Sequence, residues 1–234
     1  MKRILLLVAC FLGIAQVSSA FDPPRMHPTD RFIVTVFSDI WQNVPERMDK
    51  KAIQRGMSFK AMQDMPWGRS SFSLATGIGF TSNNLYSDHY FGYTPNGHYD
   101  FYRLSGDYDK NKLSLNYLDV PVQIRYRTRN LERNFRIYVG LKASYLVNAH
   151  TKYYGKASSV TNIYFDTPFS PGSRSIKIKE HKLENINKHK ISMTGMLGVG
   201  SVNIYLSYAL TSIFEDNQSE DMFPISLGVS VILF

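Results

Sequence analysis

The amino-acid sequence predicts an all-β fold, an eight-stranded antiparallel up-and-down transmembrane β-barrel over residues 31–234. Three observations support this prediction: eight strand-like runs, connections that alternate between long and short, and an export signal at the N-terminus. In an up-and-down barrel the odd-numbered connections share one rim and the even-numbered connections share the other. Long loops at one rim and tight turns at the other are typical of barrels in outer membranes.

The first residues of the chain have the three parts of a secretory signal peptide. A basic start is followed by the apolar stretch Ile4–Ala15 and by small residues that end at Ala20. We therefore expect residues 1–20 to be a signal peptide and residues 21–30 to form a short N-terminal segment before the barrel. The only cysteine, Cys10, would leave with the signal peptide, so no disulfide is expected in the mature chain.

A closed sheet is the only way in which the rest of the chain could cross a membrane. No later segment has 18 consecutive apolar residues, so membrane-spanning helices are excluded. A spanning protein without helices must close its sheet, because every backbone amide in lipid needs a partner. The formal net charge of +8 does not indicate nucleic-acid binding, since an exported chain does not meet nucleic acid.

The strand-like runs and their connections follow one another along the whole chain. The runs cover 31–41, 53–65, 71–81, 113–128, 134–153, 186–200, 202–213 and 223–234. The long, odd-numbered connections cover 42–52, 82–112, 154–185 and 214–222. The tight, even-numbered connections cover 66–70, 129–133 and 201. With both termini periplasmic, we expect the long connections to face outside the cell.

Alternation with a period of two separates an apolar face from a small or polar face. In the third run, Phe72 and Leu74 alternate with Ser73 and Ala75. The apolar row of the fourth run is Leu118, Val120, Val122, Ile124 and Tyr126. That of the fifth run is Phe135, Ile137, Val139, Leu141, Ala143 and Tyr145, and that of the seventh run is Val202, Ile204, Leu206, Tyr208 and Leu210. A soluble protein would bury such rows. Because the opposite faces are rich in Gly, Ala and Ser, which suit a cramped interior, we expect the apolar rows to face lipid.

Aromatic residues make up 14% of the chain, which fits the aromatic girdles of membrane barrels. The candidates for these girdles are Trp41, Phe72, Phe80, Tyr126, Phe135, Tyr145 and Phe223.

Five charged residues have the inward parity of their strands: Lys60, Asp64, Asp119, Arg125 and Lys142. The interior of an eight-stranded barrel is only wide enough for side chains to fill it. Buried charges must be paired and hydrogen-bonded. We therefore expect an interior salt-bridge network, completed by hydrogen bonds from Tyr138, Tyr205 and Asn203. A proton or ion path is the functional alternative.

The long connection 82–112 is dense in aromatic residues. They are Tyr90, Phe91, Tyr93, Tyr99, Phe101 and Tyr102. Two interpretations remain open: the rings pack on one another or extend the hairpin, or they form an exposed recognition surface outside the cell.

Basic residues gather at two further places. Around the second tight turn lie Arg125, Arg127, Arg129, Arg133 and Arg136, and anionic phospholipid head groups of the inner leaflet are a plausible partner for them. The long connection 154–185 is also basic. It would face either lipopolysaccharide phosphates, or a protein partner, or solvent alone.

The histidines do not indicate a catalytic or metal site. His189 and Ser192 are close in one run, but their spacing places them on opposite strand faces. His89 and His98, near acidic residues in the connection 82–112, are more typical of a solvated loop than of a metal site. The sequence contains no nucleophile-elbow, zinc-protease or phosphate-binding glycine motif. We assign no catalytic, cofactor-binding or metal residue.

The segment Asn116–Arg127, with its aromatic, aliphatic, acidic, aliphatic and proline order, resembles a motif of the PorT-like outer-membrane β-barrel family of Bacteroidota. Phe135–Gly140 and the terminal aromatic Phe234 are also similar to that family. The resemblance implies an eight-stranded barrel in a Gram-negative outer membrane; one member is linked to type IX secretion. Phe234 departs from the pattern, because it shares parity with Ser226 rather than with the apolar row. Either a bulge shifts the register, or Phe234 points inward.

We therefore expect a non-enzymatic structural or interaction module of the cell outer membrane, an accessory of an envelope assembly or of a type IX-like secretion system. Its expected partners are outer-membrane phospholipid and lipopolysaccharide, and envelope proteins bound through the external loops. The alternatives are a narrow channel and, less well supported, a lipid-modifying enzyme.

Overall fold

The computed structural model describes residues 30–44, 48–68, 70–93, 99–104, 108–128, 134–156, 175–181, 183, 185–215 and 221–233. The strands are β1 (Phe32–Gln42), β2 (Arg55–Pro66), β3 (Phe72–Tyr86), β4 (His89–Tyr93), β5 (Tyr99–Arg103), β6 (Tyr108–Arg127), β7 (Phe135–Lys156), β8 (Ser175–His181), β9 (His189–Val199), β10 (Val202–Ala209) and β11 (Phe223–Ile232). Among these residues, no helix is long and apolar enough to cross a membrane. The expected signal peptide, 1–20, and Phe234 lie outside the described residues.

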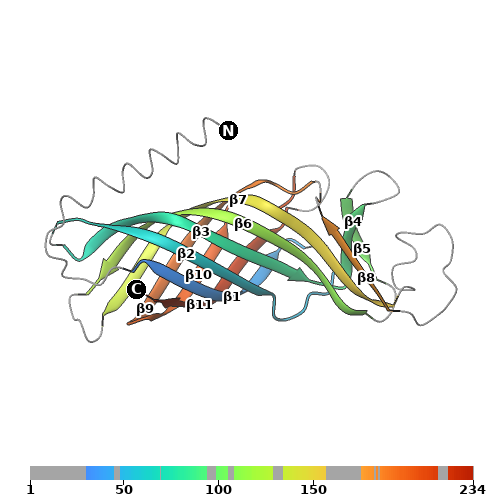
Figure 1. The fold of residues 1–234 in the computed structure, drawn as a ribbon, viewed down its shortest axis with the longest axis horizontal. Coiled ribbons are helices and arrows are strands. Elements are labelled where there is room, and N and C mark those ends of the chain that lie inside the picture. Colours follow the sequence, from blue (N-terminus) through green and yellow to red (C-terminus); the bar gives the residue numbers. More distant parts are fainter. Residues whose placement is uncertain are drawn as a thin grey trace.

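Eight of the strands close into a tilted barrel (Figure 1). Neighbouring strands pair antiparallel in the order β1, β2, β3, β6, β7, β9, β10 and β11, and β11 pairs back with β1. The strand ends that flank the tight turns lie at one end of the barrel, with the end of β11, and the strand ends that flank the long connections lie at the other (Figure 1). This confirms the predicted all-β, eight-stranded, up-and-down fold.

The long connections contain more secondary structure than the sequence predicted. The connection 82–112 holds the end of β3, the start of β6, and a separate hairpin of β4 and β5. The connection 154–185 holds β8, which pairs with β7 from His150 onward, where β9 no longer does. β6 and β7 therefore extend as a paired ribbon past the barrel, because each still has a neighbour to complete its backbone hydrogen bonds.

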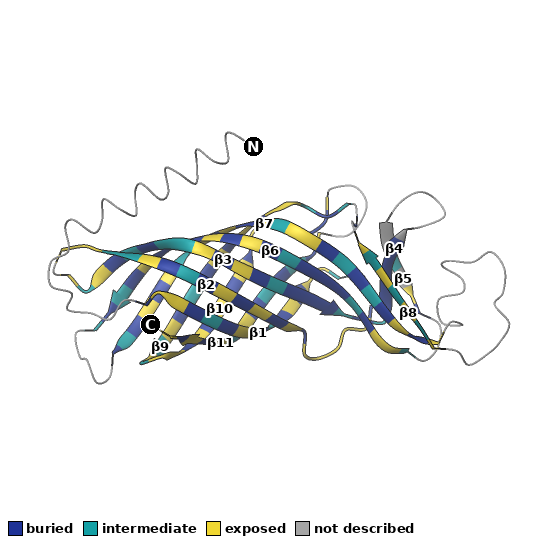
Figure 2. Cartoon of the chain, in the orientation of Figure 1, coloured by how far each residue is buried: buried dark blue, intermediate teal, exposed yellow. Residues whose placement is uncertain are grey.

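The two faces of the barrel wall have the reverse chemistry of a soluble barrel. Large apolar side chains point outward, for example Val122 (45% exposed), Leu141 (54%) and Ile204 (60%). Serine, threonine, asparagine, aspartate and lysine side chains point inward and are buried. Figure 2 shows this as alternating yellow and blue steps along the strands. Because such a continuous apolar surface is unfavourable in water, the outer wall is suited to contact with lipid.

A β-bulge in β7 changes which side chains face outward near the long-loop end. The register between β6 and β7 shifts between Asn116 and Tyr117, which leaves Val147 as an extra residue in β7. Outward side chains of β7 are odd-numbered up to Tyr145 and even-numbered from Asn148 on. The bulge therefore moves a different set of residues onto the outer surface of the extension.

Phe37 shows how tightly the lumen is filled. Its ring is buried and lies over Gly56 on β2. A Cβ at Gly56 would come within 2.1 Å of the ring, and one at Gly228 on β11 would come within 2.5 Å of the Phe37 Cα. Only glycine allows an aromatic ring to fit at this level.

Candidate functional site

The central cluster of the lumen surrounds Asp119 of β6. Its carboxylate accepts hydrogen bonds from Ser144 (2.6 Å) and from Thr81, and the Lys142 Nζ lies 3.5 Å away. Thr81 comes from β3, and Ser144 and Lys142 come from β7, the two neighbours of β6. All four side chains are buried. Asp119 is thus fully paired at a level where an unpaired carboxylate would be strongly destabilising.

A second carboxylate at this level, Asp39 of β1, connects strands that are not neighbours. Asp39 accepts hydrogen bonds from Ser226 (2.6 Å) and Asn83 (2.8 Å). Asn83 in turn accepts one from the Lys190 Nζ (2.9 Å), which also lies 3.7 Å from the centroid of the Tyr117 ring. Since β3 and β9 are separated in the barrel order, this chain of contacts crosses the lumen.

Lys60 of β2 completes the central cluster as a third buried ammonium. Its Nζ lies 4.5 Å from the centroid of the Tyr205 ring, a cation–π contact. Among the described residues it has no hydrogen-bond acceptor. The central cluster therefore contains three lysines, Lys60, Lys142 and Lys190, against two aspartates.

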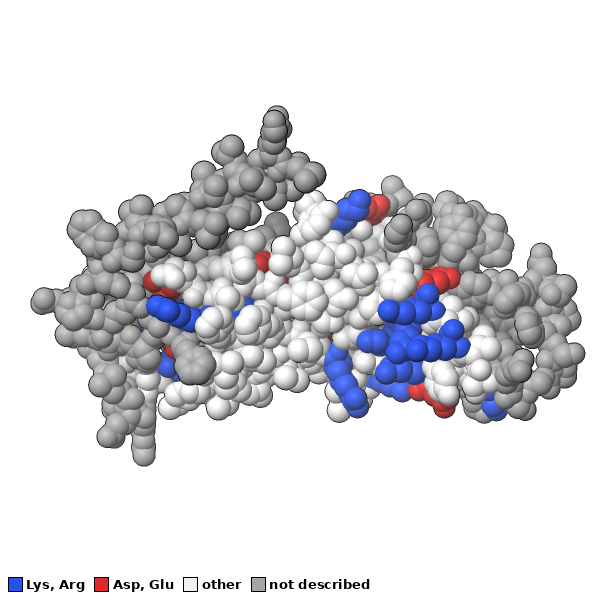
Figure 3. Space-filling model, in the orientation of Figure 1, with Lys and Arg blue, Asp and Glu red and all other residues white. Residues whose placement is uncertain are grey.

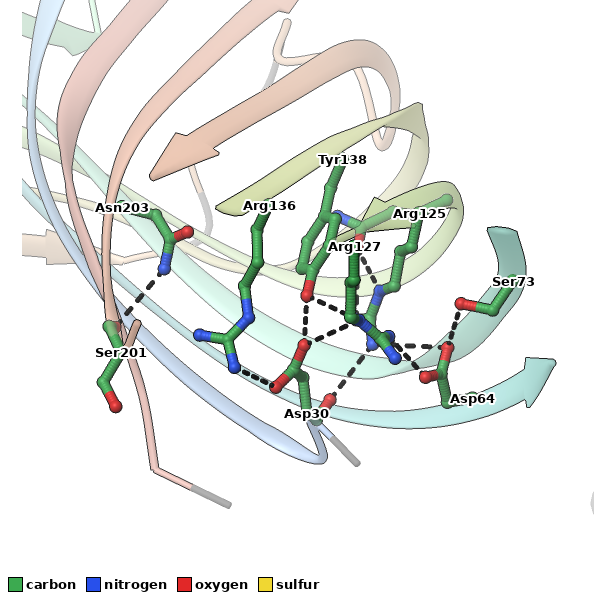
Figure 4. Close-up of polar contacts among 10 residues, drawn as sticks. Asp30, Asp64, Ser73, Arg125, Arg127, Arg136, Tyr138, Ser201 and Asn203 are labelled. Atoms are coloured by element: carbon green, nitrogen blue, oxygen red, sulfur yellow. Dashed lines mark hydrogen bonds and ion pairs between the residues drawn. The ribbon is translucent and has the colours of Figure 1, made fainter. Parts of the chain in front are cut away.

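At the tight-turn end, arginines of β6 and β7 form the rim cluster with two aspartates (Figure 4). Arg127 forms an ion pair with Asp64, and its Nε lies 3.1 Å from Asp30. The Arg136 Nη2 lies 3.2 Å from the other Asp30 oxygen. The Arg125 Nη1 lies 3.7 Å from Asp64. The two carboxylates thus hold three guanidinium groups together across the lumen.

Neutral side chains complete the rim cluster. The Tyr138 hydroxyl donates a hydrogen bond to Asp30 and accepts one from the Arg127 Nε (2.9 Å). Ser73 donates to Asp64 (2.9 Å). With these contacts, side chains from β2, β3, β6 and β7 are joined to Asp30, which lies two residues before β1 begins.

The five charged residues assigned to the interior occupy two clusters rather than one network. Lys60, Asp119 and Lys142 belong to the central cluster, whereas Asp64 and Arg125 belong to the rim cluster. Tyr138 and Tyr205 take part as described above. Asn203 instead donates a hydrogen bond to the backbone of Ser201 (3.3 Å).

Sequence reasoning missed several members of both clusters. Asp39 and Lys190 have the inward parity of their strands, and this signal would have identified them. Asp30 has no such signal, because it precedes the first run and reaches the lumen only through the fold.

The expectation that the basic turn faces lipid head groups is wrong for three of its arginines. Arg125, Arg127 and Arg136 are buried inside the barrel and interact with Asp30 or Asp64. Their parity directs them inward, where carboxylates compensate their charge. Arg129 and Arg133 lie outside the described residues.

An apolar plug closes the lumen at the long-loop end. Its members are Trp41, Met48, Leu85, Phe91, Leu113, Leu115, Tyr117, Ala149, Leu183, Ile186, Ile213, Phe214 and Met222. Barrel strands contribute inward side chains, and each of the long connections contributes at least one residue. Trp41 therefore points into the plug, and its assignment to an aromatic girdle is wrong; Phe72, Phe80 and Tyr145 are exposed on the outer wall.

The three aromatic side chains of β4 and β5 that the structure describes, Tyr90, Phe91 and Phe101, pack toward the interior. Tyr90 and Phe91 are buried, so neither can form the exposed recognition surface considered above. The Phe91 and Phe101 rings are both in contact with Phe214, with centroids 5.3 and 5.6 Å from its ring. The rings turn inward because the lumen offers apolar partners that solvent does not. The side chains of Tyr93, Tyr99 and Tyr102 lie outside the described residues.

The structure places His189 and Ser192 on opposite faces of β9. His189 is exposed, with its ring 5.3 Å from that of Tyr145, whereas Ser192 points into the lumen. The His89 Nδ1 is 2.6 Å from Asp88, and His98 lies outside the described residues. Within the described part of the chain, no group of three or more metal-ligating side chains is found.

Comparison with known proteins identifies one similarity. A family model for the outer membrane protein beta-barrel domain matches residues 31–215. Neither the curated proteins nor the solved structures gave a match.

Proposed function

The chain belongs to the outer membrane protein beta-barrel family, and from this premise we propose that it is a non-enzymatic structural and interaction module of the cell outer membrane. The observation that carries the proposal is the filled lumen. The rim cluster, the central cluster and the apolar plug occupy it at successive levels. A barrel filled in this way is not suited to passing solutes. It is suited to holding rigidly the elements beyond its long-loop end, which are the β6–β7 ribbon, β8 and the β4–β5 hairpin and which we call the external extension.

The external extension supplies the surface through which the module would act. The β6–β7 ribbon, β8 and the β4–β5 hairpin all lie at the long-loop end, and the plug anchors the hairpin through Phe91. Rigid elements that carry exposed side chains present a partner with a preformed surface, which lowers the entropy cost of binding. The proposed partners are envelope proteins.

The PorT-like motif in Asn116–Arg127 supports a narrower form of the proposal. Within that motif, Asp119 and Arg125 are central members of the two lumen clusters, so the motif encodes a way to fill the barrel. An accessory role in envelope assembly or in a type IX-like secretion system would follow from this resemblance to proteins of Bacteroidota.

A paired crosslinking experiment tests the interaction role. A photoreactive residue replaces Arg103 on β5 (side chain 68% exposed) or, as the matched control, Trp67 (54% exposed) at the tight-turn end. After illumination of intact cells, position 103 should capture a defined envelope protein that position 67 does not. Capture at neither position, or equally at both, would contradict an external interaction surface.

The alternatives have readouts of their own. Reconstituted in planar bilayers, the barrel should give no discrete conductance steps, because charged and apolar side chains fill its lumen. Stable unitary steps would establish a channel instead. Altered lipid A in a deletion strain, restored by the wild-type chain, would establish a lipid-modifying enzyme.

Orientation can be tested with single cysteines, since the mature chain is expected to contain none. Ile53→Cys at the long-loop end should react with a membrane-impermeant maleimide on intact cells, whereas Ser201→Cys in the β9–β10 turn should react only after lysis. The reverse pattern would invert the barrel.

A further inference from the structure

Lysines form rows across the outer surface of the external extension. Lys112 of β6 pairs in register with Lys152 of β7, which pairs in turn with Lys179 of β8. In the next outward row, Lys110 and Lys177 flank Tyr154. We call Lys110, Lys112, Lys152, Lys177 and Lys179 the lysine surface.

A row of histidines borders the lysine surface on the side of the barrel. His150 of β7 pairs in register with His181 of β8, and their rings lie 5.6 Å apart. On β6 the same row contains Ser114. The three rows of paired positions thus contain cations and neutral residues and no carboxylate.

Like charges directly opposite each other across strands destabilise a sheet. None of these lysines forms an ion pair with an acidic side chain of the described residues. Burial, and then the neighbouring Lys110, Lys152 and Lys179, lower the pKa of Lys112. Lys112 is partly compensated, because its Nζ donates a hydrogen bond to Asn84 (2.8 Å) and lies 5.8 Å from the centroid of the Tyr86 ring. Among the described residues, no ion pair offsets the charges of Lys152, Lys177 and Lys179, so repulsion remains between them.

Protection of a sheet edge explains only part of this pattern. β8 is the last strand of its sheet, and lysines on edge strands prevent unwanted pairing. This accounts for Lys177 and Lys179. It does not account for Lys152, because β7 is paired on both sides there, nor for Lys112, which lies between β3 and β7.

The lysine surface lies on the same outer wall as the apolar band and beyond it. The last large apolar outward side chain of β6 before the extension is Leu118, and Lys112 has the same parity farther along the strand. Figure 3 shows a central band almost free of charge and a gathering of basic side chains toward the long-loop end.

The distance from the apolar band indicates which kind of head group the lysines would meet. The six residues from Leu118 to Lys112 correspond to about 20 Å along the strand, or roughly 15 Å along the axis of a tilted barrel. The polar layer of a phospholipid leaflet is only about 5–8 Å deep. A charged group at the level of Lys112 therefore belongs to a larger head group, such as a phosphorylated saccharide.

We propose that the lysine surface binds the phosphate groups of a phosphorylated glycolipid in the outer leaflet. The inference rests on the proposed outer-membrane location. Phosphates would lie between opposed lysines, where they would turn a repulsive row into an attractive one. The neighbouring His150 would then bind a proton more readily, because an anion would offset the surrounding cations.

The test uses the mature full-length chain, refolded in vesicles of four compositions. These are zwitterionic phospholipid alone, the same with phosphatidylglycerol, the same with a phosphorylated lipopolysaccharide, and the same with that lipopolysaccharide after dephosphorylation. The readout is the Tm at which the compact band on an unboiled gel converts to the unfolded band. The test variant is Lys152→Gln/Lys177→Gln/Lys179→Gln. The control, Lys51→Gln/Arg55→Gln/Lys188→Gln, removes equal charge from exposed positions outside the rows.

The difference in Tm between the test variant and the wild type should change sign when phosphorylated lipopolysaccharide is added. In zwitterionic vesicles the test variant should melt at or above the wild-type Tm, since repulsion is removed. Phosphorylated lipopolysaccharide should raise the Tm of the wild type and of the control, but not that of the test variant. Its affinity for the test variant should fall by about 10-fold or more, because each lysine near an anionic surface contributes about five-fold.

Three results would overturn the proposal: an equal rise with the dephosphorylated lipid, an equal rise with phosphatidylglycerol, or an equal loss in the control. Crosslinking of an acidic envelope protein at position 152, with no lipid effect, would assign the surface to a protein instead. Failure of the wild type to insert into any vesicle would contradict the membrane location itself, which separates that failure from failure of this inference.

Discussion

The central cluster contains three lysines and the lysine surface contains five, and the two regions compensate this charge in opposite ways. Inside the lumen, Asp119 and Asp39 interact directly or through one side chain with Lys142 and Lys190. On the outer surface, Lys152 faces lysines on both sides. Lys60, which has no hydrogen-bond acceptor among the described residues, lies against the Tyr205 ring instead. Buried charges therefore need a carboxylate or an aromatic face within the chain, whereas exposed charges can be left for a partner to compensate.

Removal of a lumen carboxylate should have the largest effect on stability. Asp119→Ala removes the only carboxylate within ion-pair distance of the Lys142 ammonium among the described residues and the acceptor of the Ser144 hydroxyl, and it should lower the free energy of unfolding by about 3–5 kcal/mol. Urea titration of the barrel in vesicles measures the change. The double variant Asp119→Leu/Lys142→Met should recover much of the loss, and an unchanged single variant would show that the central cluster is not stabilising.

Charge placed on the outer wall near the bilayer midplane should have a slightly smaller effect. Val122→Arg and Leu141→Arg should each reduce the free energy of unfolding in vesicles by about 2–4 kcal/mol, because lipid does not solvate a guanidinium. Ser207→Thr, on the inward face, is the mild control. Tolerance of both arginines, with loss of folding in the control, would mean that the lipid-facing side has been assigned backwards.

Removing charge from the lysine surface should have a small effect of the opposite sign. In zwitterionic vesicles, Lys152→Gln should raise the free energy of unfolding by about 0.2–1 kcal/mol, because two like-charged cross-strand pairs disappear. Lys51→Gln serves as the exposed control and should leave stability unchanged. A destabilised Lys152→Gln barrel would indicate that Lys152 has an attractive contact in the free protein.

The smallest effect concerns pH at the edge of the lysine surface. Burial, and then Lys179 and Lys112, lower the pKa of His150 from 6.5 to about 4. The unfolded chain therefore binds a proton between these values that the folded chain does not, so stability should decline as the pH falls from about 6.5 to 4.

The groups facing His150 support this sign. They are Ser114 and Lys112 on β6, His181 and Lys179 on β8, and Asn148 and Lys152 on β7. His150→Gln should flatten the pH dependence of urea unfolding in zwitterionic vesicles, whereas His189→Gln should not. An unchanged slope in His150→Gln would assign the pH dependence to another group.

Local sequence pattern was enough to predict the barrel, because the two-residue period, the loop lengths and the number of strands can be recognised without knowing which residues pair across the sheet. It was not enough for the extension at the long-loop end. From the sequence, Phe91 is predicted to be an aromatic residue of a loop. It is buried because Phe214, which is far away in the sequence, packs against it in the folded chain. Val147 gives no sign that it interrupts the alternation of β7, since the bulge depends on the pairing with β6.

The sequence by itself determined the fold class, the alternation of lipid-facing and lumen-facing residues, and the need to pair charges such as Asp119 and Arg125. These follow from the geometry of one strand and from the cost of burying a charge. The tertiary structure alone decided which charges meet, for example Asp30 with Arg136, and that Lys112, Lys152 and Lys179 lie in one row. Register between strands distant in sequence is set by the closure of the whole sheet, so no single segment contains that information.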